Sequence, residues 1–137
     1  MDQAQKIKEL LSSLFKSYDQ EFIPADKELL SDFSKRALSR GVPQELISEL
    51  LEFYALTNGV PCLDSFDFHR CDDEILFEWW HDQTLWLAQR DYYTLRWVNH
   101  KYTLGDASNN SFGEEYEFGT LTALLEFALN EWYPDGI

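Results

Sequence analysis

The spacing of apolar residues changes along the chain, and this change constrains the fold more than any other feature. In residues 7–18 the apolar side chains recur every three or four positions, which is typical of an amphipathic helix. The same spacing returns in residues 29–37 and 46–54. Beyond Gly59 the period becomes two, that of a strand, and after Thr120 it is helical again. This order predicts one α+β domain over residues 1–137: N-terminal helices, a central antiparallel sheet and a C-terminal helix.

Proline, glycine and asparagine predict where the first helices begin and end. We expect Pro24 and Pro43 in the first turns of the second and third helices, because proline lacks the N–H that a helix start leaves unpaired. Gly41 should end the second helix, and Asn58-Gly59 the third, because these residues tolerate a left-handed backbone. The N-terminal part therefore divides into three helices with short connections.

Alternating residues predict the sheet in the second half of the chain. Asn99-His100 is a candidate two-residue hairpin turn between two such stretches. Asp72-Asp73-Glu74 should begin a short helix that runs to Trp80, because acidic side chains favour a helix N-terminus. The expected strands are residues 66–69, 84–88, 93–98, 102–104 and 116–118.

The charge of the chain is acidic and unevenly distributed. The 137 residues include 25 Asp and Glu against 11 Lys and Arg, for a net charge of −14. The last 78 residues contain 15 of the acids, four of the bases and all five Trp, so their net charge is −11. Such a chain repels nucleic-acid phosphates and anionic membranes and attracts basic proteins. We therefore expect a basic protein partner, and no binding to nucleic acid or to a membrane.

The sequence also favours a cytoplasmic location. Its N-terminus leads directly into an amphipathic pattern, so we expect no signal peptide, and it contains no apolar run long enough to span a membrane. The two cysteines, Cys62 and Cys71, are too few for a disulfide scaffold. A reduced, cytoplasmic protein fits these features.

Three stretches of the chain share with a known family the order of helices and strands and the residues at which they begin and end. They are the helix that follows Pro43 and ends at Asn58-Gly59, the aromatic-rich residues 83–106, and residues 118–125, which lead into the last helix. Together they resemble the SUKH superfamily, which includes fungal cell-wall-synthesis regulators and many bacterial immunity proteins. The resemblance covers about residues 5–133, and Gly105-Asp106 would correspond to the Gly-Asp strand turn of many members.

The resemblance implies a protein that binds rather than catalyses. The family has no common catalytic residues, and its bacterial members typically neutralise polymorphic toxins, often nucleases, by binding them. One alternative is a scaffold or regulatory binding module without a toxin. Another, suggested by the many carboxylates, is a hydrolase that uses two of them in a polar cleft. The sequence identifies neither the partner nor the oligomeric state.

One acidic and aromatic segment is the predicted partner-binding site. Adjacent tryptophans on a helix point about 100° apart, so at least one of the two here should be partly exposed. An exposed tryptophan beside carboxylates suits an arginine of a partner. The other interpretation is a solvated, solubilising surface. The site residues are Asp72, Asp73, Glu74, Glu78, Trp79, Trp80 and Asp82.

Other motifs predict no catalytic, cofactor or metal site. Cys62, His69, Cys71 and His81 lack the C-x2-C spacing of zinc sites, and Cys62 should lie in the core. The carboxylates beside Cys71 should raise its pKa and oppose thiol chemistry. Residues 106–117 match a calcium loop only in composition, because position six lacks glycine. We expect no catalytic residues, no cofactor and no metal.

Overall fold

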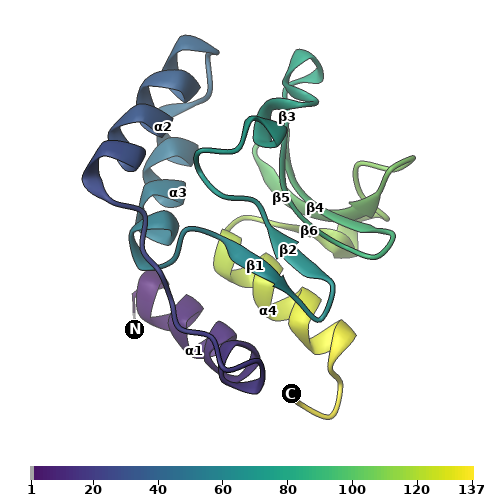
Figure 1. Ribbon diagram of the computed structural model, residues 1–137. Coiled ribbons are helices and arrows are strands. Elements are labelled where there is room, and N and C mark those ends of the chain that lie inside the picture. Colours follow the sequence, from purple (N-terminus) through teal and green to yellow (C-terminus); the bar gives the residue numbers. More distant parts are fainter. Residues whose placement is uncertain (1) are drawn as a thin grey trace.

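The computed structural model describes residues 2–137 and confirms the predicted order of helices, antiparallel sheet and final helix (Figure 1). The α-helices are α1 (Gln3–Ser17), α2 (Lys27–Ser39), α3 (Gln44–Leu56) and α4 (Leu121–Trp132). The strands are β1 (Val60–Leu63), β2 (Phe66–Phe68), β3 (Thr84–Arg90), β4 (Tyr93–Val98), β5 (Lys101–Asp106) and β6 (Glu117–Phe118). Three short 3₁₀ helices complete the list: η1 (Glu74–Phe77), η2 (Trp80–Asp82) and η3 (Glu114–Tyr116).

The six strands form one antiparallel sheet in sequence order, β1 to β6. Each strand pairs with the next along the chain, so the sheet is a meander. One of its two-residue connections is the predicted one: Val98 pairs with Lys101, and Asn99 and His100 between them have φ of 50° and 67°. Two positive φ values are what a type I′ hairpin turn requires.

The helices bury the core against one side of this sheet. α4 packs on β5 and β6, and α1 packs on α4 and α3, while α2 packs on α3 (Figure 1). Leu11 of α1, Leu50 of α3 and Leu125 of α4 are fully buried, as are Leu85 and Phe66 of the sheet. The apolar stripes read from the sequence therefore form one continuous core.

One predicted helix start and one predicted helix end are confirmed, and another predicted helix start is wrong. Pro43 is the N-cap of α3, and Gly41, with φ of +82°, follows the end of α2. Pro24, in contrast, lies outside α2 in an extended connection. The helix begins after Asp26, whose carboxylate accepts a hydrogen bond from the Leu29 N–H at 2.8 Å. A side chain that accepts a hydrogen bond from an unpaired N–H of the first helical turn determines this start better than the missing N–H of a proline does.

The predicted stop at Asn58-Gly59 is correct in place, but the two residues act differently. α3 ends at Leu56, and only Gly59 has a left-handed φ, of +88°. Asn58 instead uses its side chain, which accepts from the Cys71 N–H at 2.8 Å and donates to Asp72 at 3.2 Å. This residue therefore ties the end of α3 to the segment after β2.

Three further predictions are corrected. The single helix expected from Asp72 to Trp80 is replaced by η1 and η2, because Asp73 accepts from the N–H of Ile75, only two residues on. Cys62 is exposed rather than buried, since an irregularity in β1 between Val60 and Leu63 gives it a φ of 53° and turns it outward. The last strand contains only residues 117–118, with Tyr116 in η3.

Candidate functional site

The predicted segment, residues 72–82, connects β2 to β3 and places its two tryptophans against opposite faces of the sheet. Trp79 stacks on Trp86 of β3, with ring centroids 4.1 Å apart and planes 13° apart. Trp80 lies 6.4 Å from Trp97 of β4 and donates its indole N–H to the carbonyl of Arg40 at 2.7 Å. Both tryptophans are partly exposed, which confirms that at least one would be. Each ring, however, also has a structural partner.

Three of the five predicted carboxylates are engaged within the protein. Glu74 forms ion pairs with Arg36 at 2.8 Å and Arg40 at 2.9 Å, which links η1 to α2. Asp72 binds Arg70 at 3.1 Å, and the hydrogen bond from this guanidinium lowers the pKa of the carboxyl. Asp73 is the N-cap of η1. These three residues therefore hold the segment in place.

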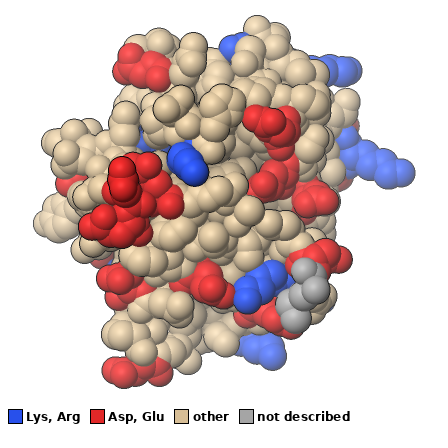
Figure 2. All heavy atoms as spheres, turned by 180° about the vertical axis from the view of Figure 1, so that it is seen from behind, with Lys and Arg blue, Asp and Glu red and all other residues tan. Residues whose placement is uncertain are grey.

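The other two carboxylates are available to a partner. Glu78 is exposed, and although its backbone N–H donates to the Ile75 carbonyl, its carboxylate has no hydrogen bond or ion pair among residues 2–137. Asp82 is exposed, and the ion-pair partner of its carboxylate is the equally exposed His81, at 3.3 Å. Elsewhere on the surface the acidic side chains form several separate groups, as Figure 2 shows for one face. Only two of the five carboxylates in residues 72–82 are therefore free to pair with a partner.

The structure adds a residue that the sequence analysis missed, Arg96 of β4. This side chain is only 4% exposed, and its guanidinium lies 4.0 Å from the ring centroid of Trp79. It donates to Thr94 Oγ1 at 3.0 Å, to Asn110 Oδ1 at 2.6 Å and to the Asp106 carbonyl at 2.6 Å. Burial lowers its pKa. Neutral hydrogen-bond acceptors and an aromatic face therefore hold this cation. Both kinds of interaction are stronger where water is excluded.

The loop after β5 places Asn110 over Arg96. Asp106 accepts hydrogen bonds from the N–H groups of Ser108 and Asn109 at 2.9 and 2.8 Å, which closes a tight turn. A side chain at Gly105 would meet the Asn109 carbonyl at 2.1 Å, so this turn requires glycine. The alternation of β4 predicts that Arg96 and Trp97 point to opposite faces of the sheet. No local pattern predicts that the ring of Trp79 covers the Arg96 guanidinium.

Asp67 and His69 form a desolvated pair beside this stack. His69 Nδ1 lies 3.8 Å from Asp67 Oδ2, and its ring meets Trp86 edge-on at 5.2 Å. Burial lowers the pKa of His69 and raises that of Asp67, and His69 Nε2 has no hydrogen-bond partner. The thiol of Cys71 is not a partner of this pair, because its Sγ donates to the Leu29 carbonyl at 3.9 Å.

The thiol of Cys71 is also poorly suited to nucleophilic chemistry. Burial, followed by the Asp72 carboxylate, raises its pKa to about 11. The predicted direction of this shift is confirmed, although burial contributes more than the neighbouring charge. A thiol at neutral pH is then almost entirely protonated, and the thiolate is the reactive form.

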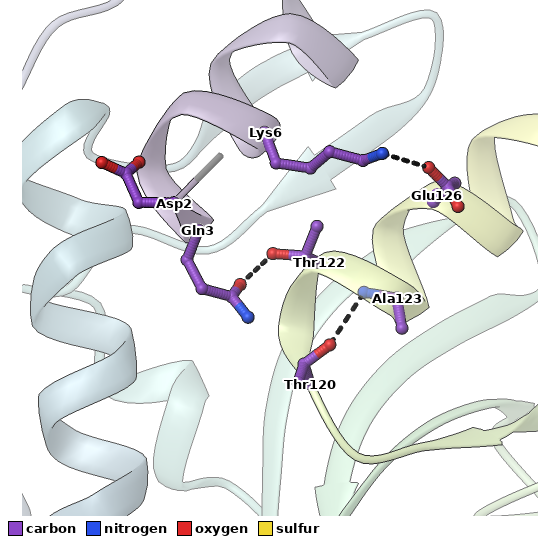
Figure 3. A pocket seen from close by; sticks show the side chains of 7 residues that line it. All are labelled: Asp2, Gln3, Lys6, Thr120, Thr122, Ala123 and Glu126. Atoms are coloured by element: carbon purple, nitrogen blue, oxygen red, sulfur yellow. Dashed lines mark hydrogen bonds and ion pairs between the residues drawn. The ribbon is translucent and has the colours of Figure 1, made fainter.

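A hollow of about 440 Å³ lies between the first turns of α1 and α4 (Figure 3). Lys6 and Glu126 point toward one another across it and form an ion pair at 3.0 Å, and Thr122 donates to Gln3. Thr120 caps α4 by accepting from the Ala123 N–H at 3.1 Å. The polar groups of this hollow therefore bind one another.

A second hollow, of about 400 Å³, lies between the α1–α2 connection and residues 57–61. Its lining includes the apolar side chains of Ile23, Pro24 and Pro61. Two of its polar lining residues are already engaged, because Asp26 caps α2 and Asn58 binds Cys71. Asp67, whose pKa burial raises, also lines this second hollow, whereas the polar groups of the first hollow are engaged in internal contacts.

Residues 2–137 also contain no group of three or more His, Cys, Asp or Glu side chains that could hold a metal ion. No helix among them is long and apolar enough to cross a membrane. Comparison of the chain with family models, with curated proteins and with solved structures finds no match. The function is therefore argued from the geometry and chemistry of the chain itself.

Proposed function

We propose that this chain is a non-enzymatic protein-binding domain for a basic partner, and that it acts in the cytoplasm as a SUKH-like immunity protein. The observation that carries the proposal is the contrast between two kinds of surface. Free carboxylates and partly exposed aromatic rings occur together in residues 78–82, which line neither of the two hollows described, whereas polar lining residues of both hollows are engaged in internal contacts. A flat acidic and aromatic surface suits a protein partner, and an enzyme requires a pocket with free convergent groups.

The proposed mechanism is occlusion of a basic toxin, possible targets being nucleases, whose clefts carry Lys and Arg. The charge of −14 raises the rate of encounter with such a partner. Free carboxylates such as Glu78 and Asp82 then pair with its cations, and partly exposed rings supply anchors. A scaffold or regulatory module without a toxin would use the same surface chemistry.

Binding kinetics against a basic, toxin-like protein, sought among the products of neighbouring genes, test the proposal. We expect the association rate to fall steeply as salt is raised, and to fall further when Glu78 and Asp82 are both changed to Lys. The matched control is Glu9→Lys with Glu52→Lys, which makes the same change in net charge at exposed positions on α1 and α3. Binding that is absent, or that is indifferent to salt and to both pairs of substitutions, would overturn the proposal.

A further inference from the structure

Five aromatic side chains from separate parts of the chain form a continuous row along one border of the sheet. Successive ring centroids lie 6.2, 6.1, 5.6 and 5.5 Å apart. The rings come from the C-terminal end of α4, the first residue of β4, the β5–β6 connection, η3 and the middle of α4. In order, this aromatic row is Trp132, Tyr93, Phe112, Tyr116 and Phe127.

Part of the row is open to solvent, although three of its rings also pack against the core. Tyr93 is 38% exposed and Phe112 36%, and the remaining three rings are partly exposed. Tyr92, next to Tyr93 in the chain at the tip of the β3–β4 hairpin, is 87% exposed. A contiguous patch of this kind marks an interaction surface more often than isolated apolar residues do. Aromatic rings are also the side chains most enriched among interface anchors.

The charged residues next in sequence to the rings of the row are acidic, although Arg90 packs on Trp132. After Lys101 the chain contains seven Asp and Glu and no Lys or Arg. Glu114 and Glu115 are adjacent in sequence to Tyr116 of the row, and Glu131 to Trp132. These three carboxylates are exposed and form no ion pair within the described residues. They differ in this respect from Asp72 and Glu74, whose charges are compensated by arginines of the same chain.

One end of the row already shows which ligand its rings accept. The guanidinium of Arg90 lies 5.2 Å from the ring centroid of Trp132 and 5.3 Å from that of Tyr133. It is held there by Asp64, at 3.1 Å. An arginine on an aromatic face with a carboxylate beside it is therefore a stable arrangement at this border, and cations bind aromatic faces through the ring quadrupole.

We propose that the aromatic row, with Glu114, Glu115 and Glu131, is the main docking surface for an Arg- and Lys-rich segment of a protein partner. The inference rests on the proposed function and deepens it, since it moves the main contact from residues 72–82 to this border. Basic side chains stack on Tyr93, Phe112 and Tyr116 and pair with the carboxylates. A second copy of this chain fits poorly, because a symmetric contact would bring the same carboxylates face to face.

The test is titration of the full chain with a short peptide of alternating Arg and Ser, with an Asp-for-Arg peptide as the control ligand. Two-dimensional NMR locates the contact and calorimetry gives the affinity. We expect shifts centred on Tyr93, Phe112 and the indole of Trp132, and no response to the acidic peptide. Tyr93→Leu with Phe112→Leu should weaken binding by about tenfold, since leucine keeps an apolar surface but removes the aromatic faces.

The acidic residues are tested with a matched pair of variants. Glu114→Gln with Glu131→Gln should weaken binding of the basic peptide more than Glu78→Gln with Asp82→Asn, which removes the same number of charges. Unchanged melting temperatures verify that each variant is folded. Shifts confined to residues 72–82 would overturn this inference and leave the proposed function intact. No binding of the basic peptide would count against both, and a dimer that Phe112→Leu dissociates would show that a second copy occupies the row.

Discussion

Gly59 lies where the chain leaves α3 and enters β1, and its backbone is under two constraints at once. Its φ is +88°, and a Cβ there would lie 2.2 Å from the Phe68 carbonyl of the neighbouring strand. Gly59→Ala should therefore destabilise the protein by about 3 kcal/mol, from left-handed strain and from displacement of β2. Urea unfolding of the variant measures this loss.

Gly41 provides the matched control for that substitution. Its φ is +82°, but a Cβ there would meet nothing within 4 Å. Gly41→Ala should therefore cost only the backbone strain, about 1 kcal/mol. Equal losses at the two glycines would contradict the argument, because the close approach of Phe68 would then add nothing.

His69 should make stability depend on pH. Burial lowers its pKa in the folded state below the ordinary value of about 6.5, despite the opposing charges of Asp67 and Asp73. As pH falls below about 6.5, the unfolded chain binds a proton that the folded chain does not, so stability decreases toward the folded pKa. His69→Gln should flatten the curve of unfolding free energy between about pH 7 and pH 5.

An exposed imidazole serves as the comparison. His100 lies in the β4–β5 turn and contacts Glu45 at 3.3 Å on the surface. His100→Gln should retain the loss of stability on acidification that the parent shows. If His69→Gln kept the same slope as the parent, the buried imidazole would not be the group responsible.

At the scale of elements, α2 tests which residue determines a helix start. Asp26 accepts from the Leu29 N–H, whereas Pro24 lies in the extended connection before it. Asp26→Ala should cost about 1 kcal/mol, the usual value of an N-cap, and Pro24→Ala much less. Thermal melting of the two variants decides between the positions, and a larger loss at Pro24 would restore it as the residue that starts the helix.

The elements that the sequence predicts well are those whose signal is local. Period and punctuation locate the four helices and the β4–β5 hairpin, because stripes, caps and the Asn99-His100 turn depend on neighbouring residues. The segment between β2 and β3 is different. Its backbone follows contacts with distant residues, such as Trp79 on Trp86 and Glu74 on Arg36, and no local pattern contains them.

The candidate site was predicted only in part for the same reason. Composition draws attention to residues 72–82, and both tryptophans there are partly exposed. Composition cannot show that Asp72, Asp73 and Glu74 have partners within the chain. Nor can it assemble the aromatic row, whose rings come from positions 93 to 132 and meet only after the sheet and α4 are packed together.

For the whole molecule, the net charge of −14 has two consequences that salt should separate. Self-repulsion of the carboxylates opposes the compact state, so screening it should stabilise the fold. The melting temperature should rise as NaCl is increased from about 10 mM to about 150 mM, over which the screening length falls from about 30 Å to about 8 Å. Short internal pairs such as Glu74–Arg36, at 2.8 Å, are screened much less.

Changing Glu78 and Asp82 to Lys gives the decisive comparison, because it reduces the net charge from −14 to −10 without removing an internal ion pair with Lys or Arg. The variant should melt at a higher temperature than the parent in low salt and gain less from added salt. A melting temperature that falls with NaCl would mean that favourable ion pairs outweigh the self-repulsion. The same salt should slow association with a basic partner. If added salt raises the melting temperature and slows association, the same negative charge destabilises the free protein and speeds its binding.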